Sequence, residues 1–422
     1  MSGVVHVIGA GMAGLAAAVH AQAAGRMVHV WDAAPQAGGR CRSYRDPQLD
    51  CVIDNGNHLV LSGNTAIARL LAITGASDRL VGPAQPCVPF HDGPSGRSWA
   101  VRPNVGRMPW WVLRPNRRPP GFGFADIRAA IGMLRAGPAA TLAPFLPQGR
   151  TRAAFWDPLI LAVMNAPAAL AAARPMAQVL RETFGRGGAA SRPLVARTSL
   201  ADTFVDPAVD WLQARGAQVT LGRRIRALDR DGDGAVRSLQ PEGGDLVAIG
   251  TQDRVILAVP PAIAASLVPD CPVPVGDTPI VNVHFLLNAA PQNPAGDAPL
   301  IGLVGTTAHW VFLRDRIASV TISAADALVG QTADAIIHQV WPEVASALAL
   351  PGGQTPPPAR VVKEKRATFL QTPANQALRP DTARFGRRLV LAGDWTDTGL
   401  PATIEGSVRS GEKAAFVALQ PA

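Results

Sequence analysis

Cysteine is scarce in this chain of 422 residues, and the spacing of the four present excludes two kinds of site. Cys41, Cys51, Cys87 and Cys271 form no C-x-x-C pair and match no metal-ligand spacing. The sequence therefore predicts neither a disulfide-stapled domain nor a bound metal. Reduced thiols are usual in the cytosol, and no cleavable signal is recognisable, so we expect a cytoplasmic protein.

Lysine and runs of one charge are also rare. The three lysines, at positions 363, 365 and 413, leave arginine to supply nearly all of the formal charge of +9. No run of five or more basic residues occurs, which argues against a nucleic-acid partner. A diffuse positive surface would still suit an anionic membrane face.

No segment is expected to cross a membrane. The most apolar early stretch, residues 4–24, carries three spaced glycines and lacks a basic leading segment, which argues against a membrane span and a signal core. The composition is otherwise globular, with 48% apolar and 17% charged residues, and the length predicts two or three domains.

The pattern at residues 4–31 is typical of a mononucleotide-binding unit. We expect a strand at 4–8, a helix to about residue 24 and a second strand at 27–31. Gly9, Gly11 and Gly14 lie between the first strand and the helix, in the spacing G-x-G-x-x-G. Gly9 would permit the tight turn, Gly11 would let the backbone approach a pyrophosphate, and Gly14 would let helix and strand pack closely.

The neighbours of these glycines are candidate phosphate and ribose ligands. A helix N-terminus offers free N–H groups to phosphates, which brings Ala10, Met12 and Ala13 into the expected site. Asp32, followed by Ala33, ends the second strand at the distance expected for bonding ribose hydroxyls. The alternative is a glycine-rich turn that binds no ligand.

Other apolar patterns predict further elements along the chain. We expect helices at 63–75, 202–215 and 404–419, a largely helical stretch at 150–183, and strands at 218–221, 255–259, 280–287, 389–392 and within 310–323.

Gly38, Gly39 and Arg40 begin a G-G-R-x-x-S pattern soon after the second strand. This pattern resembles the FAD-binding amine oxidase and phytoene desaturase superfamily. The resemblance implies a non-covalently bound FAD, with the two glycines close to it and the arginine near its phosphates. The alternative for Arg40 is a surface position on a turn.

The C-terminal sequence LAGDWTDTGLPATIEGSVRSGEKAA resembles the flavin-closing motif of the same superfamily. The resemblance implies that Gly393 and Asp394 reach the pyrophosphate and ribityl chain. It also implies that Thr403 and Ile404 begin a helix facing the N1/C2=O edge of the flavin, where a helix N-terminus stabilises negative charge by about 0.3–2 kcal/mol. Trp395 would line the flavin ring or the substrate cavity, or else pack in the core.

A less specific resemblance concerns the strand that contacts adenine. Ile225, in the segment GAQVTLGRRIRAL, matches the strand that gives adenine an apolar backbone contact in this superfamily.

Three strings narrow the resemblance to one family. They are Asp54-Asn55-Gly56-Asn57-His58, residues 155–167 and the C-terminal closure, and together they resemble the hydroxysqualene dehydroxylases, or squalene-associated FAD-dependent desaturases, of bacterial hopanoid synthesis. The resemblance covers essentially the whole chain and is weakest over residues 98–149. One departure is Asn57, where the family pattern usually has glutamine, so a specific contact of Asn57 is in doubt.

The resemblance implies reductive removal of an allylic hydroxyl from hydroxysqualene to give squalene. Hydride from the reduced flavin would replace the hydroxyl, which leaves as water and needs a proton donor within hydrogen-bond reach. His58 is the first candidate and Asp54 the second. In the alternative, Asp54 and Asn55 hold the loop together and His58 bonds flavin or backbone.

The fold class that follows is α/β. We expect a Rossmann-like FAD-binding domain of the amine oxidase and phytoene desaturase type, with an inserted α+β substrate-binding domain. The expected FAD-binding segments are 1–85, 195–270 and 365–422, and the expected substrate-binding segments are 86–194 and 271–364.

The expected partners are a lipophilic isoprenoid and an unidentified electron donor, because no second glycine fingerprint offers a nicotinamide site. Residues 107–118 combine Met108, Trp110 and Trp111 with four arginines. This mixture suits peripheral contact with the inner face of the cell membrane. The alternative is a proline-rich loop with its tryptophans packed inward.

Three other functions compete with the dehydroxylase. The first is a carotenoid or polyprenoid desaturase or oxidase working in the oxidative direction, which the fold alone does not separate. The second is an amine oxidase, disfavoured because all lysines are C-terminal and Tyr44 is the sole tyrosine. The third is a non-catalytic FAD-binding scaffold.

Overall fold

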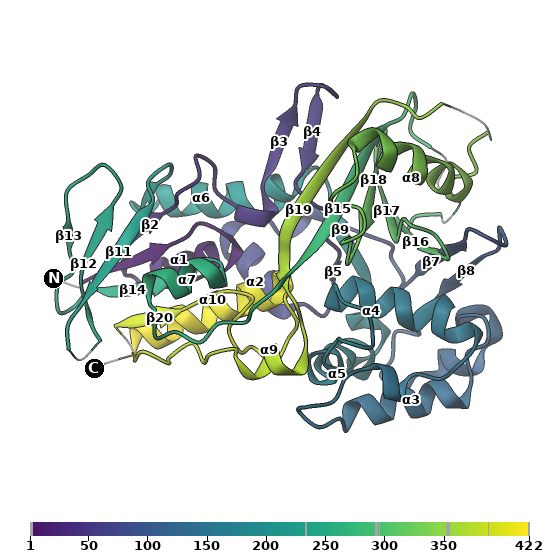
Figure 1. The fold of residues 1–422 in the computed structure, drawn as a ribbon, viewed down its shortest axis with the longest axis horizontal. Coiled ribbons are helices and arrows are strands. Elements are labelled where there is room, and N and C mark those ends of the chain that lie inside the picture. The colour runs from purple at the N-terminus through teal and green to yellow at the C-terminus, as the bar shows by residue number, and fades with distance from the viewer. Residues whose placement is uncertain are drawn as a thin grey trace.

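A parallel five-stranded sheet forms the nucleotide-binding half of the molecule (Figure 1). The computed structural model describes residues 3–232, 234–291, 294, 296–351, 355–386 and 388–420. The strand order is β10–β2–β1–β14–β20, with every neighbouring pair parallel. The strands are β1 (Val4–Ile8), β2 (Met27–Trp31), β10 (Gln218–Thr220), β14 (Arg254–Leu257) and β20 (Leu389–Leu391).

Both faces of this sheet are covered, as the apolar character of its strands requires. Helices α1 (Met12–Ala23), α2 (Thr65–Thr74), α6 (Asp206–Gln213) and α10 (Ile404–Leu419) pack in the apolar cluster on one face. Helix α7 (Pro261–Leu267) and the strands β11 (Ile225–Arg230) and β12 (Val236–Pro241) pack in the cluster on the other face. Helix α10 lies directly against α1. A Cβ atom on Gly411 would come within 2.1 Å of the Ala13 carbonyl oxygen, so this close approach requires glycine.

A second sheet, mostly antiparallel, forms the other half of the molecule. Its order is β19–β15–β18–β17–β16–β7–β8. Val281, Val283 and Phe285 alternate along β15 on the face covered by helix α8 (Ala333–Ala347). The strands are β7 (Val88–Asp92), β8 (Ser98–Val101), β15 (Asp277–Leu286), β16 (Leu300–Val304), β17 (Trp310–Arg314), β18 (Ile317–Ile322) and β19 (Ala359–Phe369).

The long strands β15 and β19 run from this second sheet toward the nucleotide-binding half (Figure 1). All strands of the parallel sheet fall in segments that the sequence assigns to FAD binding. Strand β19 crosses the boundary expected between residues 364 and 365. The division into domain segments stays a prediction.

Three helices of the expected substrate-binding segment form a separate group beside the second sheet (Figure 1). They are α3 (Phe124–Leu134), α4 (Asp157–Met164) and α5 (Ala173–Glu182). The helical stretch expected at 150–183 is interrupted after α4, because Asn165 adopts a left-handed conformation with φ of 46°. Its side chain amide donates to the Thr278 carbonyl (3.2 Å) and its oxygen accepts from the Ala324 N–H (2.7 Å).

Smaller elements connect these layers. The remaining strands and the short helix α9 are β3 (Ser43–Asp46), β4 (Cys51–Asp54), β5 (Val60–Leu61), β6 (Leu80–Val81), β9 (Pro193–Ala196), β13 (Val247–Ala248) and α9 (Pro373–Ala377). Short 3-10 or π turns occupy Gly39–Cys41, Ser77–Arg79, Trp110–Leu113, Pro115–Arg117, Ala143–Phe145, Arg152–Trp156, Phe184–Arg186, Gly188–Ala190 and Ala201–Val205.

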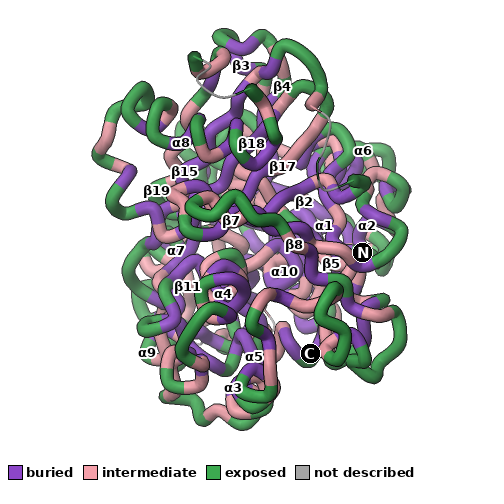
Figure 2. Tube along the Cα trace, turned by 90° about the vertical axis from the view of Figure 1, so that its right-hand side faces the viewer, coloured by how far each residue is buried: buried purple, intermediate pink, exposed green. Residues whose placement is uncertain are grey.

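The sheets and their covering helices are largely buried, and exposed residues gather on the outer loops and helix surfaces (Figure 2). Within the described ranges, no helix has the length and apolar content needed to span a bilayer. The apolar stretch at residues 4–24 is β1 followed by α1.

Candidate cofactor and active site

The three fingerprint glycines have three different surroundings. Gly9 has a φ of 108°, in the region that favours glycine. A Cβ atom on Gly14 would lie 1.8 Å from the Gly9 carbonyl oxygen, so this position must be glycine for helix and turn to pack. A Cβ atom on Gly11 would meet nothing within 4 Å. The open space beside Gly11 is therefore where a ligand can approach the backbone.

The N-terminus of α1 faces this space with unpaired donors. The first hydrogen bond that closes a turn of α1 runs from the Leu15 N–H to the Gly11 carbonyl, at 2.9 Å. The N–H groups of Met12, Ala13 and Gly14 precede it and are left without helical acceptors. Such donors, with the positive end of the helix dipole, fit a diphosphate.

Asp32 links the glycine turn to the next strands. Its carboxylate accepts from the Ala10 N–H at 2.6 Å and from the Ala34 N–H at 2.7 Å. Each oxygen keeps a lone pair that fits a ribose hydroxyl. Ala33 is exposed beside it.

The segment between β10 and β11 lies beside Asp32, at the end of β2. Arg223 donates its N–H to the Asp32 carbonyl at 2.8 Å. Ile225 lies two residues further on and is 5% exposed, in the apolar cluster that also contains Trp31. Its contact with adenine stays a prediction.

The second glycine loop lies against the first. The Gly38 N–H donates to the Ala10 carbonyl at 2.8 Å, and a Cβ atom on Gly39 would lie 3.4 Å from the Gly11 Cα. Gly38 and Gly39 both have positive φ, at 103° and 55°. The two loops expected to hold the cofactor are therefore adjacent, although helix α1 and strand β2 separate them in the sequence.

Arg40 joins the second glycine loop to the C-terminal flavin-closing motif through an ion pair with Asp394. Its Nη2 lies 2.8 Å from the Asp394 Oδ2, and its Nη1 donates to the Ala367 carbonyl. Asp394 raises the pKa of the guanidinium, so the charge on Arg40 is retained. The side chain remains 38% exposed, so the guanidinium is held by protein partners and is still accessible to an anionic ligand.

Gly393 and Trp395 lie against each other at the start of the flavin-closing motif. The Gly393 N–H donates to the Ser410 Oγ at 2.9 Å, and a Cβ on Gly393 would lie 2.4 Å from the Trp395 indole nitrogen. Trp395 is fully buried and donates to the Val259 carbonyl at 2.8 Å. Its burial favours the alternative in which Trp395 packs in the core, and its contact with the flavin or the substrate stays a prediction.

Helix α10 starts where the flavin-closing motif predicts. Thr403 caps it, its Oγ1 accepting from the Gly406 N–H at 3.1 Å. Ile404 is the first helical residue. The free N–H groups of this first turn fit the electron-rich edge of a reduced flavin.

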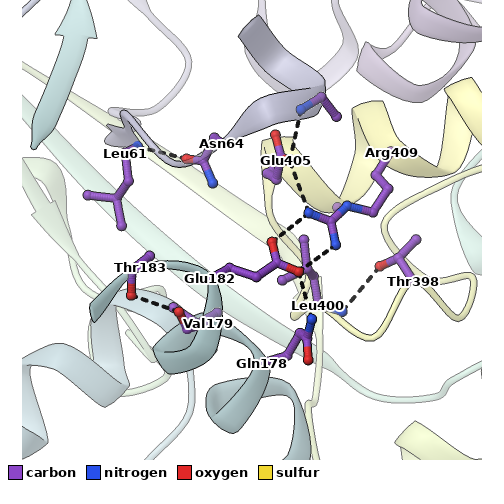
Figure 3. A network of polar contacts seen from close by, with 12 residues as sticks. Leu61, Asn64, Gln178, Val179, Glu182, Thr183, Thr398, Leu400, Glu405 and Arg409 are labelled. Atoms are coloured by element: carbon purple, nitrogen blue, oxygen red, sulfur yellow. Dashed lines mark hydrogen bonds and ion pairs between the residues drawn. The ribbon is translucent and has the colours of Figure 1, made fainter. Parts of the chain in front are cut away.

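An ion-pair network behind α10 was not predicted from the sequence (Figure 3). Arg409 binds the Glu182 carboxylate with both terminal nitrogens and also lies 3.1 Å from Glu405. Glu405 in turn accepts from the Ala66 and Ile67 N–H groups at the start of α2. The network holds α10, α2 and α5 together. The i,i+4 spacing of Glu405 and Arg409 was its only signal in the sequence.

Asp54 has a full set of structural partners. Its carboxylate accepts from the Ser43 Oγ (2.6 Å) and the Leu200 N–H (2.9 Å), and pairs with the Arg314 Nη2 (2.8 Å). It is 2% exposed. These contacts favour the alternative in which Asp54 holds its loop in place.

The next three residues tie this loop to the second sheet. The Asn55 amide donates to the Glu364 carboxylate at 3.0 Å, and the Asn57 amide donates to the Thr321 Oγ1 at 3.0 Å. Asn282 donates to the Asn55 carbonyl at 3.4 Å, and a Cβ on Gly56 would lie at the same distance from its amide. The shorter amide of Asn57 thus reaches protein partners on β15 and β18.

His58 differs from its neighbours, because its imidazole makes no hydrogen bond with any residue that the structure describes. Burial lowers its pKa to about 4, although Asp54 opposes this shift. His58 is therefore neutral near pH 7 and presents one N–H donor. It borders a small cavity of about 30 Å³ that Asp54, Asn57 and Arg314 also line.

Arg314, Asn282 and Thr321 are site residues that were missed. Asn282 and His284 occupy alternate positions on β15, on the face away from α8. Two polar residues at a spacing of two within an otherwise apolar strand indicate that one face of the strand meets a polar site, and this pattern is visible in the sequence.

A larger cavity of about 580 Å³ lies between α4 and the ends of β15, β18 and β19. Leu161, Leu170 and Leu370 line it, together with Thr278 and Ser323. Its volume falls in the range typical of small-molecule sites.

Comparison with known proteins gives matches over nearly the whole chain. The family model described as flavin containing amine oxidoreductase matches residues 12–419. A hydroxysqualene dehydroxylase of Rhodopseudomonas palustris is 44% identical over 99% of this chain and 99% of that protein. One from Sinorhizobium fredii is 42% identical over 98% of each chain. The crystal structure of a putative protoporphyrinogen oxidase from Exiguobacterium is similar in fold, with a TM-score of 0.68 at 14% identity over 99% of this chain and 98% of that one.

Proposed function

We infer the function of this chain from its family: it belongs to the flavin containing amine oxidoreductases and, among them, to the hydroxysqualene dehydroxylases. It is an FAD-dependent oxidoreductase. Its reaction is the reductive removal of the hydroxyl of hydroxysqualene to give squalene, in squalene and hopanoid synthesis. The observation that carries this conclusion is the near-full-length match to hydroxysqualene dehydroxylases at 39–44% identity.

We propose that the FAD diphosphate binds between the two glycine loops. The open space at Gly11, the free N–H groups of α1 and the positive charge of Arg40 support this position. Asp32 would bond the adenosine ribose. The first turn of α10 would face the flavin, and when bound and reduced, the cofactor supplies a hydride.

Replacement of a hydroxyl by hydrogen consumes one hydride and one proton and releases one water. The carbon–oxygen bond breaks as the carbon–hydrogen bond forms, so the leaving oxygen needs a donor. We propose that neutral His58 donates an N–H hydrogen bond to this oxygen, since its imidazole has no described protein partner and borders open space, and that solvent supplies the proton with which the hydroxyl leaves as water. Asp54, paired with Arg314, is assigned the role of positioning the loop that carries His58.

The substrate is proposed to be hydroxysqualene itself, a long lipophilic isoprenoid. The cavity of about 580 Å³ with its leucine lining supports an apolar ligand. The electron donor that reduces the flavin is proposed to be a separate molecule. We further propose that the protein acts in the cytoplasm, at the inner face of the cell membrane where such a substrate dissolves. All four cysteines are free, which fits a reducing compartment.

Anaerobic single-turnover chemistry tests this function. Purified protein with stoichiometric FAD is mixed with hydroxysqualene after chemical reduction of the flavin and, separately, with phytoene while the flavin is oxidised. We expect squalene and oxidised flavin from the first mixture and neither product nor reduced flavin from the second. Desaturation of phytoene by the oxidised enzyme, without formation of squalene, would instead establish the carotenoid desaturase alternative.

A further inference from the structure

We propose that the segment of residues 97–192 docks on the surface of an anionic membrane through one apolar patch. We call this patch the Trp110 face and define it as Met108, Trp110, Leu113 and Phe124. The inference rests on the proposed function in one respect, that the enzyme works at a membrane. It does not depend on which isoprenoid is converted.

The positive charge of the chain is concentrated in this segment. Residues 97–192 contain 14 arginines, no lysine and three acidic residues, which gives an excess of 11 positive charges. The whole chain carries only +9, so the rest of it is slightly acidic. The positive surface is therefore not diffuse, and one part of the molecule is far more basic than the remainder.

The three acidic residues of the segment do little to offset this charge at its surface. Asp126 is 2% exposed and accepts from the Trp156 indole and the Gly123 N–H, both at 2.8 Å. Glu182 is held by Arg409. Ten arginines that are exposed in this segment form no ion pair within the described part of the chain: Arg97, Arg102, Arg107, Arg114, Arg128, Arg135, Arg150, Arg174, Arg181 and Arg186.

The four residues of the Trp110 face expose large apolar side chains within the same arginine-rich segment. Met108 is 60% exposed, Trp110 61%, Leu113 67% and Phe124 75%. The adjacent Trp111 points the other way. It is 6% exposed, with its ring centroid 5.8 Å from that of Phe122. The hypothesis of a membrane-facing tryptophan thus applies to Trp110 alone.

The turn that presents this patch is held by its own hydrogen bonds. The Asn104 amide donates to the Gly106 and Met108 carbonyls at 3.0 and 2.8 Å, and its oxygen accepts from the Trp111 N–H at 3.1 Å. Phe124 starts α3 two residues after Phe122, whose ring contacts Trp111. Trp110 is therefore displayed by an ordered turn, which lowers the entropy lost on docking.

An anionic bilayer matches both properties of this surface. Tryptophan, leucine and phenylalanine side chains enter the interfacial layer, and arginines beside them bind lipid phosphates. A nucleic acid or an acidic protein would match the arginines but leave the apolar side chains of the Trp110 face without an apolar environment.

Co-sedimentation of the FAD-loaded protein with vesicles tests the proposal without any substrate. We compare vesicles of phosphatidylcholine alone with vesicles of phosphatidylcholine and phosphatidylglycerol. The test variant carries Trp110→Ser and Phe124→Ser. The control carries Leu246→Ser and Phe416→Ser, which change side chains that are 64% and 65% exposed outside the segment. A third variant carries Arg107→Gln and Arg114→Gln.

We expect wild type and control to bind the anionic vesicles equally. The Trp110 and Phe124 variant should partition roughly tenfold or more weakly, since it buries two fewer large apolar side chains. The arginine variant should lose about fivefold for each charge removed and depend less on salt. Flavin absorbance and circular dichroism verify that each variant is folded.

Absence of wild-type binding to anionic vesicles overturns the proposal, and so does an equal loss in the control. Equal binding to both vesicle types overturns its electrostatic part. If the wild type does not bind vesicles but is retained by an immobilised acidic protein, the partner of the Trp110 face is a protein and the proposal is wrong. A chain that binds vesicles as expected yet leaves hydroxysqualene unchanged would count against the proposed function alone.

Discussion

Arg409 on α10 and Glu182 on α5 form a bidentate ion pair, with nitrogen–oxygen distances of 2.8 and 2.6 Å. The pair joins the helix that begins at the expected flavin edge to a helix of the expected substrate-binding segment. Planar, paired hydrogen bonds of this kind fix orientation as well as distance. The relative position of α10 and α5 therefore depends on two side chains that are distant in sequence.

Removal of Arg409 should strongly destabilise the fold. In Arg409→Met, Glu182 and Glu405 stay buried without their shared cation, so we expect a loss of about 3–5 kcal/mol in the free energy of unfolding. Urea titration of the apoprotein measures it. Arg69→Met breaks a more exposed pair with Glu412 on the same helix and should cost at most about 1 kcal/mol. Equal losses in both variants would contradict this account.

Two substitutions in the first glycine loop should affect different properties, FAD affinity in one variant and fold stability in the other. In Gly11→Ala the new methyl group meets no protein atom but occupies the space assigned to the diphosphate. We expect an apoprotein melting temperature close to wild type and FAD affinity weakened by roughly tenfold or more. Gly14→Ala should instead unfold at lower temperature, because its Cβ clashes with the Gly9 carbonyl. Flavin fluorescence gives the affinity. Unchanged affinity in Gly11→Ala would place the cofactor elsewhere.

His58 offers a test of the leaving-group donor. We expect His58→Ala to retain FAD and to slow single-turnover flavin reoxidation by roughly 10²-fold or more. Because the pKa of His58 is lowered to about 4, the wild-type rate should not fall between about pH 6 and pH 8 through its titration. A rate that falls through a pKa near 6.5 and loses this dependence in the variant would show that the imidazolium is the acid.

Buried histidines predict acid sensitivity of the fold. Burial lowers the pKa values of His29, His58, His284 and His309 to about 4, below the 6.5 of an unfolded chain. Between these values the unfolded chain takes up protons that the folded chain does not, so stability falls as pH falls from about 6.5 toward 4. Urea midpoints between about pH 7.5 and pH 4.5 measure this. His284→Gln, at a fully buried position, should reduce the slope, and an unchanged slope would refute its contribution.

Local patterns in the sequence predicted the nucleotide-binding unit well. The strands at 4–8 and 27–31 and the helix at 404–419 have the predicted bounds. Each is specified by its own residues: an apolar strand, three spaced glycines, or a threonine cap followed by an amphipathic helix. The fold class and the FAD cofactor are confirmed by the comparisons for the same reason, since the motifs that identify them are contiguous.

Features that depend on distant residues were not predictable in this way. The helical stretch at 150–183 is broken because the Asn165 side chain finds partners on β15 and beyond β18. The sequence does not distinguish the neighbours Trp110 and Trp111. Trp111 is the buried one because its ring packs against the rings of Phe122 and Phe184. The partner of Asp54 lies 260 positions away, at Arg314.

The contact between Gly411 and Ala13 has a consequence for how the chain is made. Translation makes helix α1 before the edge strand β20, which pairs with β14, and before helix α10, which packs on α1. The apolar surface of α1 that α10 covers therefore stays exposed until α10 has left the ribosome, and a product that lacks α10 exposes a surface prone to aggregation.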